Sequence, residues 1–367
     1  MGTFSKADSG HMARALTLAE RGQYSARPNP MVGCVIVRDQ QVIGEGWHQR
    51  AGDAHAEINA LEAAGDDAAG ATVYVTLEPC AHHGKTPPCA EALVSAGVSK
   101  VVVAMQDPND SVAGRGLDIL RAAGIQVETG LMAASAEALN QGFVSRMTRA
   151  RPFVRLKIAA SIDGAIAMKN GDSQWITGAP ARDDVQRLRA GSGAVMTGIG
   201  TVLADDPSLN VRSHDLAAAG VQPVRVVLDS QLRMPLAATM LTIPGTTLVC
   251  FAGDKDPGHL LATGAEVFCT GRDHAQVDVV PVLAELARRE INDVLVEAGP
   301  ELAGHLLEKR LIDELVIYQS PHIMGSETQR MFATPTMQQL SDRLQLDIFD
   351  TRRIGEDTRI SARIVNL

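Results

Sequence analysis

Apolar residues in the first 149 positions gather in short runs, and Gly, Pro and polar residues separate one run from the next. Runs rich in Val and other apolar residues predict strands, whereas longer stretches with apolar positions at helical spacing predict helices. We expect strands at 32–37, 72–77 and 101–105, alternating with helices at 12–21, 55–64, 89–96, 114–123 and 134–149. This alternation is typical of a largely parallel sheet that helices cover on both faces.

A second pattern of the same kind starts with an expected strand at 153–160. It follows the basic, proline-stopped stretch Thr148-Arg149-Ala150-Arg151-Pro152, so we place a domain boundary between residues 1–149 and 150–367. Further elements are expected as helices at 181–190 and 301–308 and as strands at 194–197, 224–228, 247–251, 294–297, 315–319, 344–349 and 359–364. The 367 residues exceed one ordinary domain, so we expect two sequential α/β domains, each with its own core.

Charge and composition narrow the classes of partner. The chain has 34 Lys and Arg against 43 Asp and Glu, a net charge of −9, and its aromatic residues are 7 Phe, 3 Tyr and 2 Trp. Without a basic stripe or stacking aromatics we expect no nucleic-acid partner, although a small phosphorylated metabolite remains open. No apolar run reaches the roughly 18–20 residues of a membrane span, and the first residues lack the apolar core of a secretory signal. We therefore expect a cytoplasmic protein without membrane contact.

The cysteines and one histidine suggest a metal site. Five cysteines, an odd number, argue against a disulfide framework in a cytoplasmic chain. One expected helix begins with His55-Ala56-Glu57, and Cys80 and Cys89 follow later in the chain. One imidazole and two thiolates suit zinc, which binds them in a tetrahedron and leaves the fourth position for water. Pro87-Pro88 places Cys89 in the first turn of the next helix, where free N–H groups and the helix dipole favour a thiolate.

Glu57 stands two residues after His55, so it can lie beside the metal without binding it. A His-x-Glu motif followed by Pro-Cys and a second Cys is the signature of zinc deaminases. In such a site zinc lowers the pKa of its bound water to roughly 7, hydroxide attacks an amidine carbon, and the carboxylate carries a proton to the leaving ammonia. We therefore predict His55, Cys80 and Cys89 as zinc ligands and Glu57 as the proton shuttle.

The opposing interpretation is structural, with His55 capping a helix and the cysteines filling a core. Most zinc deaminases have Cys-x-x-Cys, whereas eight residues separate Cys80 from Cys89 here. Cys34 is a rival ligand, but its apolar run 32–37 favours a core position. Cys250 and Cys269 lack partners in the sequence and are expected to pack in the interior.

Several longer motifs resemble the bifunctional deaminase–reductase family of bacterial riboflavin biosynthesis. In the first half they are His48 and residues 28–33, 76–89 and 105–109, and in the second half they are residues 156–164, 173–177, 201–207 and 296–300. The resemblance extends from about Met12 to the last residue, and it accounts for the eight residues between Cys80 and Cys89.

The resemblance implies a cytidine-deaminase-like three-layer α/β domain at 1–149 and a dihydrofolate-reductase-like α/β domain at 150–367. The first, zinc-dependent domain would remove the 2-amino group of 2,5-diamino-6-(5-phosphoribosylamino)pyrimidin-4-one by hydrolysis. The second would pass a hydride from NADPH to the ribosyl C1′, giving 5-amino-6-(5-phosphoribitylamino)uracil. The family also implies a homo-oligomer, a dimer or higher.

Site residues follow from the same resemblance. Asn29, His48, His82 and Lys85 would line the pyrimidine or phosphate site of the deaminase, with a structural role in their loops as an equal alternative. The cofactor of the reductase would contact Ala159, Trp175, Thr201, Asp205, Ser230, Gly299, Pro300, Glu301, Leu302, Ala303, Gly304 and His305. Its substrate would contact Ser173, Arg189, Leu209, Arg212 and Glu297.

Part of the expected reductase site is supported by the residues themselves, because some of them are suited to bind phosphate. Residues 299–304 follow an expected strand and begin a helix, so their N–H groups and the helix dipole can hold a cofactor phosphate, although a plain strand–helix turn has the same pattern. Arg189 and Arg212 are candidates for fork-like phosphate binding, with exposed, solubilising arginines as the alternative.

Two rival functions stay open at the level of the sequence. The first is a zinc deaminase of a nucleoside or a tRNA base with an accessory second domain, which turnover of cytidine or adenosine would establish. The second is an interaction protein with a structural zinc site, in which His82 or His83 supplies a fourth ligand. That alternative predicts that Glu57→Gln leaves every activity intact.

Overall fold

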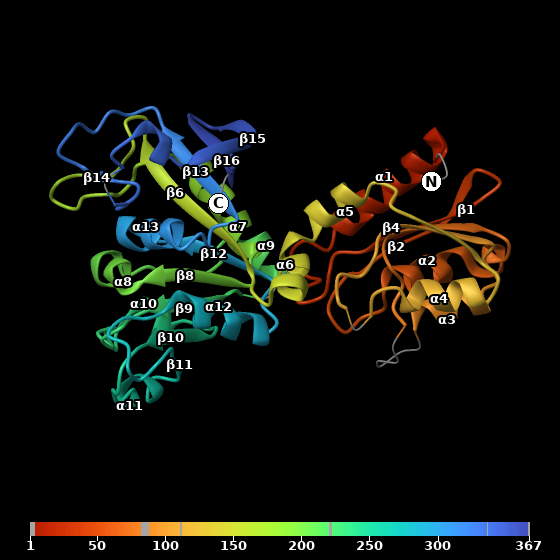
Figure 1. The fold of residues 1–367 in the computed structure, drawn as a ribbon, viewed down its shortest axis with the longest axis horizontal. Helices are drawn as coiled ribbons and strands as arrows, with labels where there is room; N and C mark the ends of the chain where they lie inside the picture. Colours follow the sequence, from red (N-terminus) through yellow and green to blue (C-terminus); the bar gives the residue numbers. More distant parts are fainter. Residues whose placement is uncertain (1–3, 82–87, 111, 220–221, 336, 366–367) are drawn as a thin grey trace. The chain divides into compact units, whose positions relative to one another are not determined.

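The computed structural model describes residues 4–81, 88–110, 112–219, 222–335 and 337–365, and the chain divides into two compact units, Met1–Ala150 and Arg151–Leu367. Figure 1 shows a mixed α/β architecture in both. The assignment of a deaminase to residues 1–149 and of a reductase to 150–367 stays a prediction at this stage.

The first unit is built on a sheet of strand order β2-β1-β3-β4-β5. Its strands are β1 (Gly33–Arg38), β2 (Gln41–Trp47), β3 (Thr72–Leu77), β4 (Lys100–Met105) and β5 (Gln126–Thr129). Its helices are α1 (Lys6–Glu20), α2 (Ala56–Ala64), α3 (Cys89–Ser95), α4 (Arg115–Ala122), α5 (Ala133–Leu139) and α6 (Gln141–Arg149).

Alternate residues of the central strands β1, β3 and β4 enter two different cores, which explains why these strands are apolar along most of their length. Cys34, Val73 and Val101 pack with the helices α2, α3 and α4, whereas Val35 and Val102 pack with α1, α5 and α6 on the other face. The first unit is therefore a three-layer structure with its sheet buried on both faces, as the resemblance implied.

The expectation of a largely parallel sheet is wrong for the first unit. Strand β1 pairs antiparallel with both β2 and β3, and only β3, β4 and β5 run parallel. The sequence pattern missed β2 because Gly44 and Gly46 interrupt it. A Cβ at Gly46 would lie 2.3 Å from the carbonyl oxygen of Ala56, so this glycine lets α2, which carries Glu57, pack directly against the sheet.

Two helices of the first unit differ from expectation. Helix α1 begins at Lys6, earlier than predicted, because Ser5 and Asp8 form a capping box around its first turn. The single helix expected at 134–149 is two helices that meet at Asn140. The Asn140 side chain accepts from the N–H of Met31 and donates to its carbonyl, which fixes the break and ties it to the loop before β1.

The second unit is built on a larger sheet of order β11-β10-β9-β8-β12-β6-β13-β16-β15. Its pairings are parallel from β11 to β13, whereas β16 pairs antiparallel with β13 and β15 pairs antiparallel with β16. Its strands are β6 (Phe153–Ser161), β8 (Ala194–Gly198), β9 (Val224–Leu228), β10 (Thr247–Phe251), β11 (Glu266–Cys269), β12 (Asp293–Glu297), β13 (Glu314–Ser320), β15 (Gln345–Ile354) and β16 (Asp357–Val365). A separate short pair is β7 (Ala165–Ala167) and β14 (Gln329–Arg330).

The helices of the second unit cover both faces of this sheet (Figure 1). They are α7 (Ala179–Ala190), α8 (Ile199–Asp205), α9 (His214–Ala219), α10 (Thr239–Thr242), α11 (Gly258–Leu261), α12 (Val279–Arg288) and α13 (Pro300–Glu308). The pattern predicted α7 and α13 but left α8 to α11 unassigned, because helices of one or two turns show too few apolar positions to reveal a period. The ten-residue α12 was missed as well, and its capping by Asp278 was the signal that could have found it.

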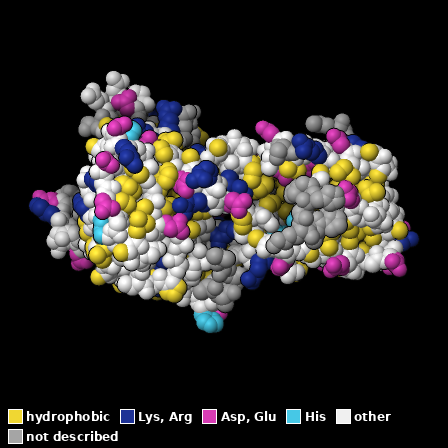
Figure 2. All heavy atoms as spheres, turned by 90° about the horizontal axis from the view of Figure 1, so that it is seen from below, with side chains coloured by type: hydrophobic (Ala, Val, Ile, Leu, Met, Phe, Trp, Pro, Cys, Tyr) yellow, Lys and Arg dark blue, Asp and Glu magenta, His cyan; other side chains and the backbone are white. Residues whose placement is uncertain are grey.

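The surface agrees with the acidic composition. On the faces drawn in Figure 2, Lys and Arg side chains are scattered among acidic and uncharged ones. In the part of the chain that the structure describes, no helix combines the length and the apolar character needed to cross a bilayer.

Candidate active sites

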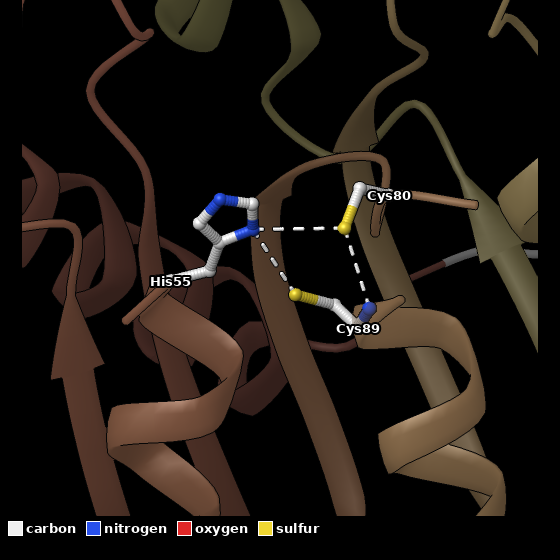
Figure 3. Close-up of side chains that lie close together, drawn as sticks. All are labelled: His55, Cys80 and Cys89. Carbon is white, nitrogen blue, oxygen red and sulfur yellow. Dashed lines mark hydrogen bonds between the residues drawn. The ribbon is translucent and has the colours of Figure 1, made fainter. Parts of the chain in front are cut away.

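The three expected zinc ligands come together at one end of the sheet in the first unit (Figure 3). His55 is the N-cap residue of α2, Cys80 follows the end of β3, and Cys89 is the first residue of α3. The N–H of Cys89 donates to Cys80 Sγ at 3.3 Å, so the start of α3 already holds one sulfur in place. Secondary structure therefore positions all three side chains before any metal binds.

The spacing of the ligand atoms fits a tetrahedral zinc ion. His55 Nδ1 lies 3.2 Å from Cys89 Sγ and 3.6 Å from Cys80 Sγ, and all three ligand atoms lie within 4.8 Å of one another. Tetrahedral zinc at ordinary bond lengths separates a nitrogen and a sulfur ligand by roughly 3.6 Å. Among the residues that the structure describes, this cluster has three members, which are the three that the sequence predicts.

The two sulfurs influence each other strongly. Hydrogen bonds from Cys89 and His55 lower the pKa of the Cys80 thiol, while the hydrogen bond to Cys80 and burial raise the pKa of the Cys89 thiol. The hydrogen bond with Cys80 also raises the pKa of His55. The site thus favours a thiolate at Cys80 even without a cation, as expected of a sulfur that binds metal.

Glu57 lies in the first turn of α2 and is only 3% exposed. Burial raises its pKa to about 7, and the charge of His55 and a hydrogen bond with Cys89 oppose that shift without cancelling it. Among the described residues, the group of possible metal ligands consists of His55, Cys80 and Cys89 and does not include Glu57. A carboxyl group beside the ligands with a pKa near neutrality is suited to accept and release a proton.

Sequence reasoning missed the role of Glu78, which lies two residues before Cys80. Its buried carboxylate accepts four backbone N–H groups, from Asp107 at 3.1 Å, Gly114 at 3.0 Å, Gly116 at 2.9 Å and Leu117 at 3.4 Å. These donors are in the loop after β4 and in the first turn of α4. The signal in the sequence was a charged residue directly after the apolar strand 72–77.

The other expected deaminase residues are partly described. His48 is 2% exposed and lies edge-on to His55, with ring centroids 5.4 Å apart, and burial lowers its pKa. Its Nε2 is 3.0 Å from Asn29 Nδ2. His82 and Lys85 lie in segment 82–87, outside the described residues, as does His83, so the roles expected of them stay predictions.

The remaining cysteines, Cys34, Cys250 and Cys269, lie in or against the hydrophobic cores, as the sequence predicts. Cys34 is fully buried in the core beneath α2, and burial raises the pKa of its thiol. Cys250 is buried in the large core of the second unit. Cys269 is half-buried, and its thiol faces the carbonyl of Gly253 at 3.8 Å.

In the second unit, the expected cofactor residues follow the carboxyl ends of adjacent parallel strands. Thr201 and Asp205 are in α8 after β8, Ser230 follows β9, and Gly299 caps α13 after β12. Ala159 is near the carboxyl end of β6, which pairs with β12. Carboxyl ends of parallel strands share one edge of a sheet, where α/β proteins bind their ligands. The turn at Gly299 begins a nine-residue helix, and there the N–H groups can meet a phosphate.

The expected substrate residues Arg189 and Glu297 form a buried ion pair. Arg189 Nε is 2.5 Å from Glu297 Oε1, Nη2 is 3.1 Å from Oε2, and Nη1 donates to the carbonyl of Asn210. Three donors of the Arg189 fork are thus already engaged within the protein. Burial alone would raise the pKa of Glu297, but Arg189 and Lys157 outweigh it and lower the pKa to about 2.

Lys157 is a second residue that sequence reasoning did not single out. Its Nζ lies 3.7 Å from Glu297 Oε2, and its side chain is largely buried, which lowers its pKa. The available signal was a lysine in the middle of the expected strand 153–160, because the pattern predicts that this strand is buried on both faces.

The other predicted reductase residues lie nearer the surface. Trp175 is 69% exposed, with the guanidinium of Arg182 4.6 Å from its ring centroid, and Ser173 is nearby in the same segment before α7. Arg212 is exposed, and its Nη1 donates to Ser208 Oγ at 2.5 Å. Leu209, in contrast, is buried. Of the two candidate phosphate ligands, Arg212 is therefore the one whose guanidinium meets solvent.

Two family models match the chain. The cytidine and deoxycytidylate deaminase zinc-binding region matches residues 5–105, and the RibD C-terminal domain matches residues 152–360. The second match assigns the second unit to the RibD C-terminal domain, which disfavours the alternative of a nucleoside deaminase with an accessory domain.

Relatives and solved structures agree over nearly the whole chain. The riboflavin biosynthesis protein RibD of Escherichia coli is 46% identical over 95% of this chain and 97% of its own length, and that of Haemophilus influenzae is 45% identical over 98% of each. The structure of Acinetobacter baumannii RibD superposes with a TM-score of 0.93 at 46% identity, covering 98% of this chain and 99% of that one. A diaminohydroxyphosphoribosylaminopyrimidine deaminase/5-amino-6-(5-phosphoribosylamino)uracil reductase from Thermotoga maritima superposes with a TM-score of 0.85 at 33% identity, with the same coverage.

Proposed function

Because the chain belongs to the RibD family of riboflavin biosynthesis proteins, we propose that its first unit performs the deamination and its second unit the reduction. The enzyme is bifunctional, a hydrolytic deaminase and a reductase, and its cofactors are zinc and NADPH. Its substrates are small pyrimidines. The residues that carry each step, and the phosphorylated form of the substrate, are part of the proposal.

In the deamination, water replaces the 2-amino group of 2,5-diamino-6-(5-phosphoribosylamino)pyrimidin-4-one, and ammonia leaves. His55, Cys80 and Cys89 would hold zinc, which supplies a Lewis acid when bound. The Glu57 carboxylate accepts a proton from the attacking water and delivers it to the departing amino nitrogen. A pKa of about 7 makes both protonation states of Glu57 accessible at neutral pH, which a group that must first accept and then donate requires.

In the reduction, the ribosyl C1′ of the deaminated product receives a hydride, which NADPH supplies, while the C1′–O4′ bond of the sugar ring breaks and O4′ takes up a proton to give the ribityl chain. The N–H groups at the start of α13, with Gly299 as N-cap, would hold a phosphate of the cofactor, and Thr201, Asp205 and Ser230 lie at the same edge of the sheet. Arg212 would bind the substrate phosphate. The buried pair of Arg189 and Glu297 would border the sugar and fix its orientation relative to the cofactor.

The single observation that supports the deaminase assignment most is the position of Glu57 beside the three ligand atoms, buried and with its pKa raised to about 7. A closed structural zinc site has no need of a buried carboxyl group of this kind.

We further propose that the enzyme works in the cytoplasm as a homo-oligomer. Light scattering of the purified chain tests the oligomeric state.

Cys80→Ser tests the division of labour between the units. The variant should lose zinc and ammonia release, while NADPH oxidation on the deaminated intermediate persists, because the reductase residues lie in the second unit. Cys269→Ser is the matched control and should keep both activities, since Cys269 is not part of the metal-binding group and its thiol faces the carbonyl of Gly253. Loss of both activities in a folded Cys80→Ser protein would contradict the proposal, as would ammonia release from zinc-free protein.

A further inference from the structure

The motif at residues 156–164 ends in a tight turn that the proposed mechanism leaves without a task. The turn follows β6, and the N–H of Gly164 donates to the carbonyl of Ser161 at 3.0 Å. Asp163, within this turn, stands four residues after the expected cofactor residue Ala159. A carboxylate has the wrong charge to bind a cofactor phosphate, so we expect Asp163 to act on another part of the protein.

The Asp163 carboxylate joins two segments that are far apart in the chain. It accepts from Ser161 Oγ at 2.5 Å in its own turn and from the N–H of Gly325 at 2.8 Å, and the N–H of Met324 lies 3.1 and 3.2 Å from its two oxygens. The Arg330 side chain donates to its backbone carbonyl. The hydrogen bonds from Ser161, Gly325 and Met324 lower the pKa of Asp163 to about 2, so the group is a charged acceptor at neutral pH.

The segment that Asp163 holds runs on to the start of α13, and we call residues 321–333 the strap. Its strand β14 pairs with β7, which follows the turn of Asp163. At the far end of the strap, the N–H of Ala333 donates to the carbonyl of Pro300 at 3.0 Å. A Cβ at Gly304 would lie 2.1 Å from the carbonyl oxygen of Ala333, so strap and helix are in direct backbone contact. Pro300 and Gly304 are both expected cofactor residues.

The strap has little else to hold it in place. The structure describes every residue from 321 to 333, and none of them is buried. Segments without buried apolar contacts open easily, so the position of the strap depends on its hydrogen bonds. Asp163 supplies the acceptor for two of its backbone N–H groups, at the end of the strap that lies away from α13.

We propose that Asp163 is a positioning residue of the reductase, which clasps the strap against α13 and thereby keeps the turn at residues 299–304 in the form that binds NADPH. This inference rests on the proposed function. Asp163 acts through the strap and does not touch the cofactor.

Removal of the carboxylate tests the proposal. Asp163→Ala should raise the Kd for NADPH about tenfold in a fluorescence titration, as expected if about one chain in ten keeps the strap in place. The kcat of reduction at saturating NADPH should stay within about twofold of wild type, because the bound cofactor restores the strap. An unchanged Kd, or a kcat that falls without a change in Kd, would overturn the proposal.

Two further variants grade the effect. Asp163→Asn keeps one of the two acceptor oxygens and should raise the Kd less than Asp163→Ala does. Glu327→Gln is the matched control, since it removes a charge from the same strap, where Glu327 forms an exposed ion pair with Lys169. Exposed ion pairs contribute little, so its Kd should stay within about twofold of wild type. A loss of affinity as large as that of Asp163→Ala would show that the charge of the strap matters and the clasp does not.

Amide hydrogen exchange separates positioning from direct contact. In ligand-free Asp163→Ala, the amide of Ala333 should exchange faster than in wild type, because the strap opens. A raised Kd with unchanged exchange at Ala333 would indicate that Asp163 contacts NADPH itself, against the proposal.

The wild-type enzyme provides a measurement that needs no substitution. If the clasped strap favours NADPH, then NADPH must favour the clasped strap, since coupling is reciprocal. Binding of NADPH should therefore slow exchange at the amides of Met324 and Gly325, which donate to Asp163. NADPH binding without this slowing would refute the inference alone, whereas a wild-type enzyme that binds no NADPH would refute the proposed reductase function.

Discussion

Glu78→Gln is a nearly isosteric change whose consequence can be worked out from four hydrogen bonds. The two carboxylate oxygens accept from two backbone N–H groups each. Glutamine keeps one oxygen and turns an NH₂ group toward the other two donors. Each buried N–H left without an acceptor costs about 1–3 kcal/mol, so the substitution should weaken this anchor by about 2–6 kcal/mol.

The effect should be local before it is global. The four donors belong to the loop after β4 and to the start of α4, where no side chain of the helix itself caps the first turn. Amide hydrogen exchange at Asp107, Gly114, Gly116 and Leu117 measures the opening of this segment directly. At 1.4 kcal/mol per tenfold change, the lower end of the range predicts exchange at least about 30-fold faster than in wild type. Amides in the strands of the second unit should be unaffected.

The substitution should also reach the metal. Gly116 packs so closely on the turn after β3 that a Cβ there would lie 1.9 Å from the carbonyl oxygen of Pro79, the residue before the ligand Cys80. Loosening α4 therefore loosens that turn, and zinc should leave faster when a chelator is added. Glu62→Gln, on the exposed side of α2, is the control and should match wild type. Unchanged exchange at the four amides of Glu78→Gln would refute the reasoning.

Three further outcomes follow from the site residues. Glu57→Gln should lower kcat of deamination by about 10²–10⁴-fold with zinc and the reductase retained, and full activity would favour the structural-zinc alternative. Arg212→Ala should raise the reductase KM for the phosphorylated substrate much more than for its dephosphorylated analogue, and an equal effect on both would show that Arg212 is not the phosphate ligand. The charges of Arg189 and Lys157 outweigh burial and hold the pKa of Glu297 at about 2, below its ordinary value of 4.5. Because its pKa is lowered in the folded state, ionised Glu297 stabilises the fold above pH 4.5, and this contribution is lost as the pH falls toward 2. The free energy of unfolding of the wild type, measured with urea, should therefore fall by about 3 kcal/mol across this window through this group. In Glu297→Gln the free energy of unfolding should depend less on pH over the same window. An equally steep profile in that variant would exclude Glu297 as the cause.

The zinc site was predictable because its determinants are local in the sequence. His55 and Cys89 stand at the first turns of two helices and Cys80 stands at the end of a strand, so each is placed by the element beside it. Strands such as 72–77, 224–228 and 247–251 were also predicted with their observed bounds, because runs buried on both faces are largely apolar. Where structure depends on neighbours in sequence, pattern and spacing were sufficient.

What the pattern could not reveal depends on residues far apart in the chain. Glu297 and Arg189 meet across 108 positions, and Asn140 meets Met31 across 109 positions to divide one expected helix into two. Strand β2 was missed because its two glycines, which weaken the strand signal, serve the packing of α2. In each case the deciding contact is tertiary, and one sequence carries no record of which distant residue supplies it.

Three buried glutamates show how tertiary partners, and not burial alone, decide what a carboxyl group does. Glu297 faces two cations that keep its pKa at about 2, and Glu78 uses its lone pairs on four backbone N–H groups. Glu57 is buried as deeply, but its polar neighbours do not offset the loss of water, and its pKa rises to about 7. The first two carboxylates are thereby held in one arrangement, whereas the third is free to exchange a proton at neutral pH. Of these three carboxyl groups, the one whose charge the fold stabilises least lies beside the predicted zinc ligands, as the proposed transfer of a proton from water to ammonia requires.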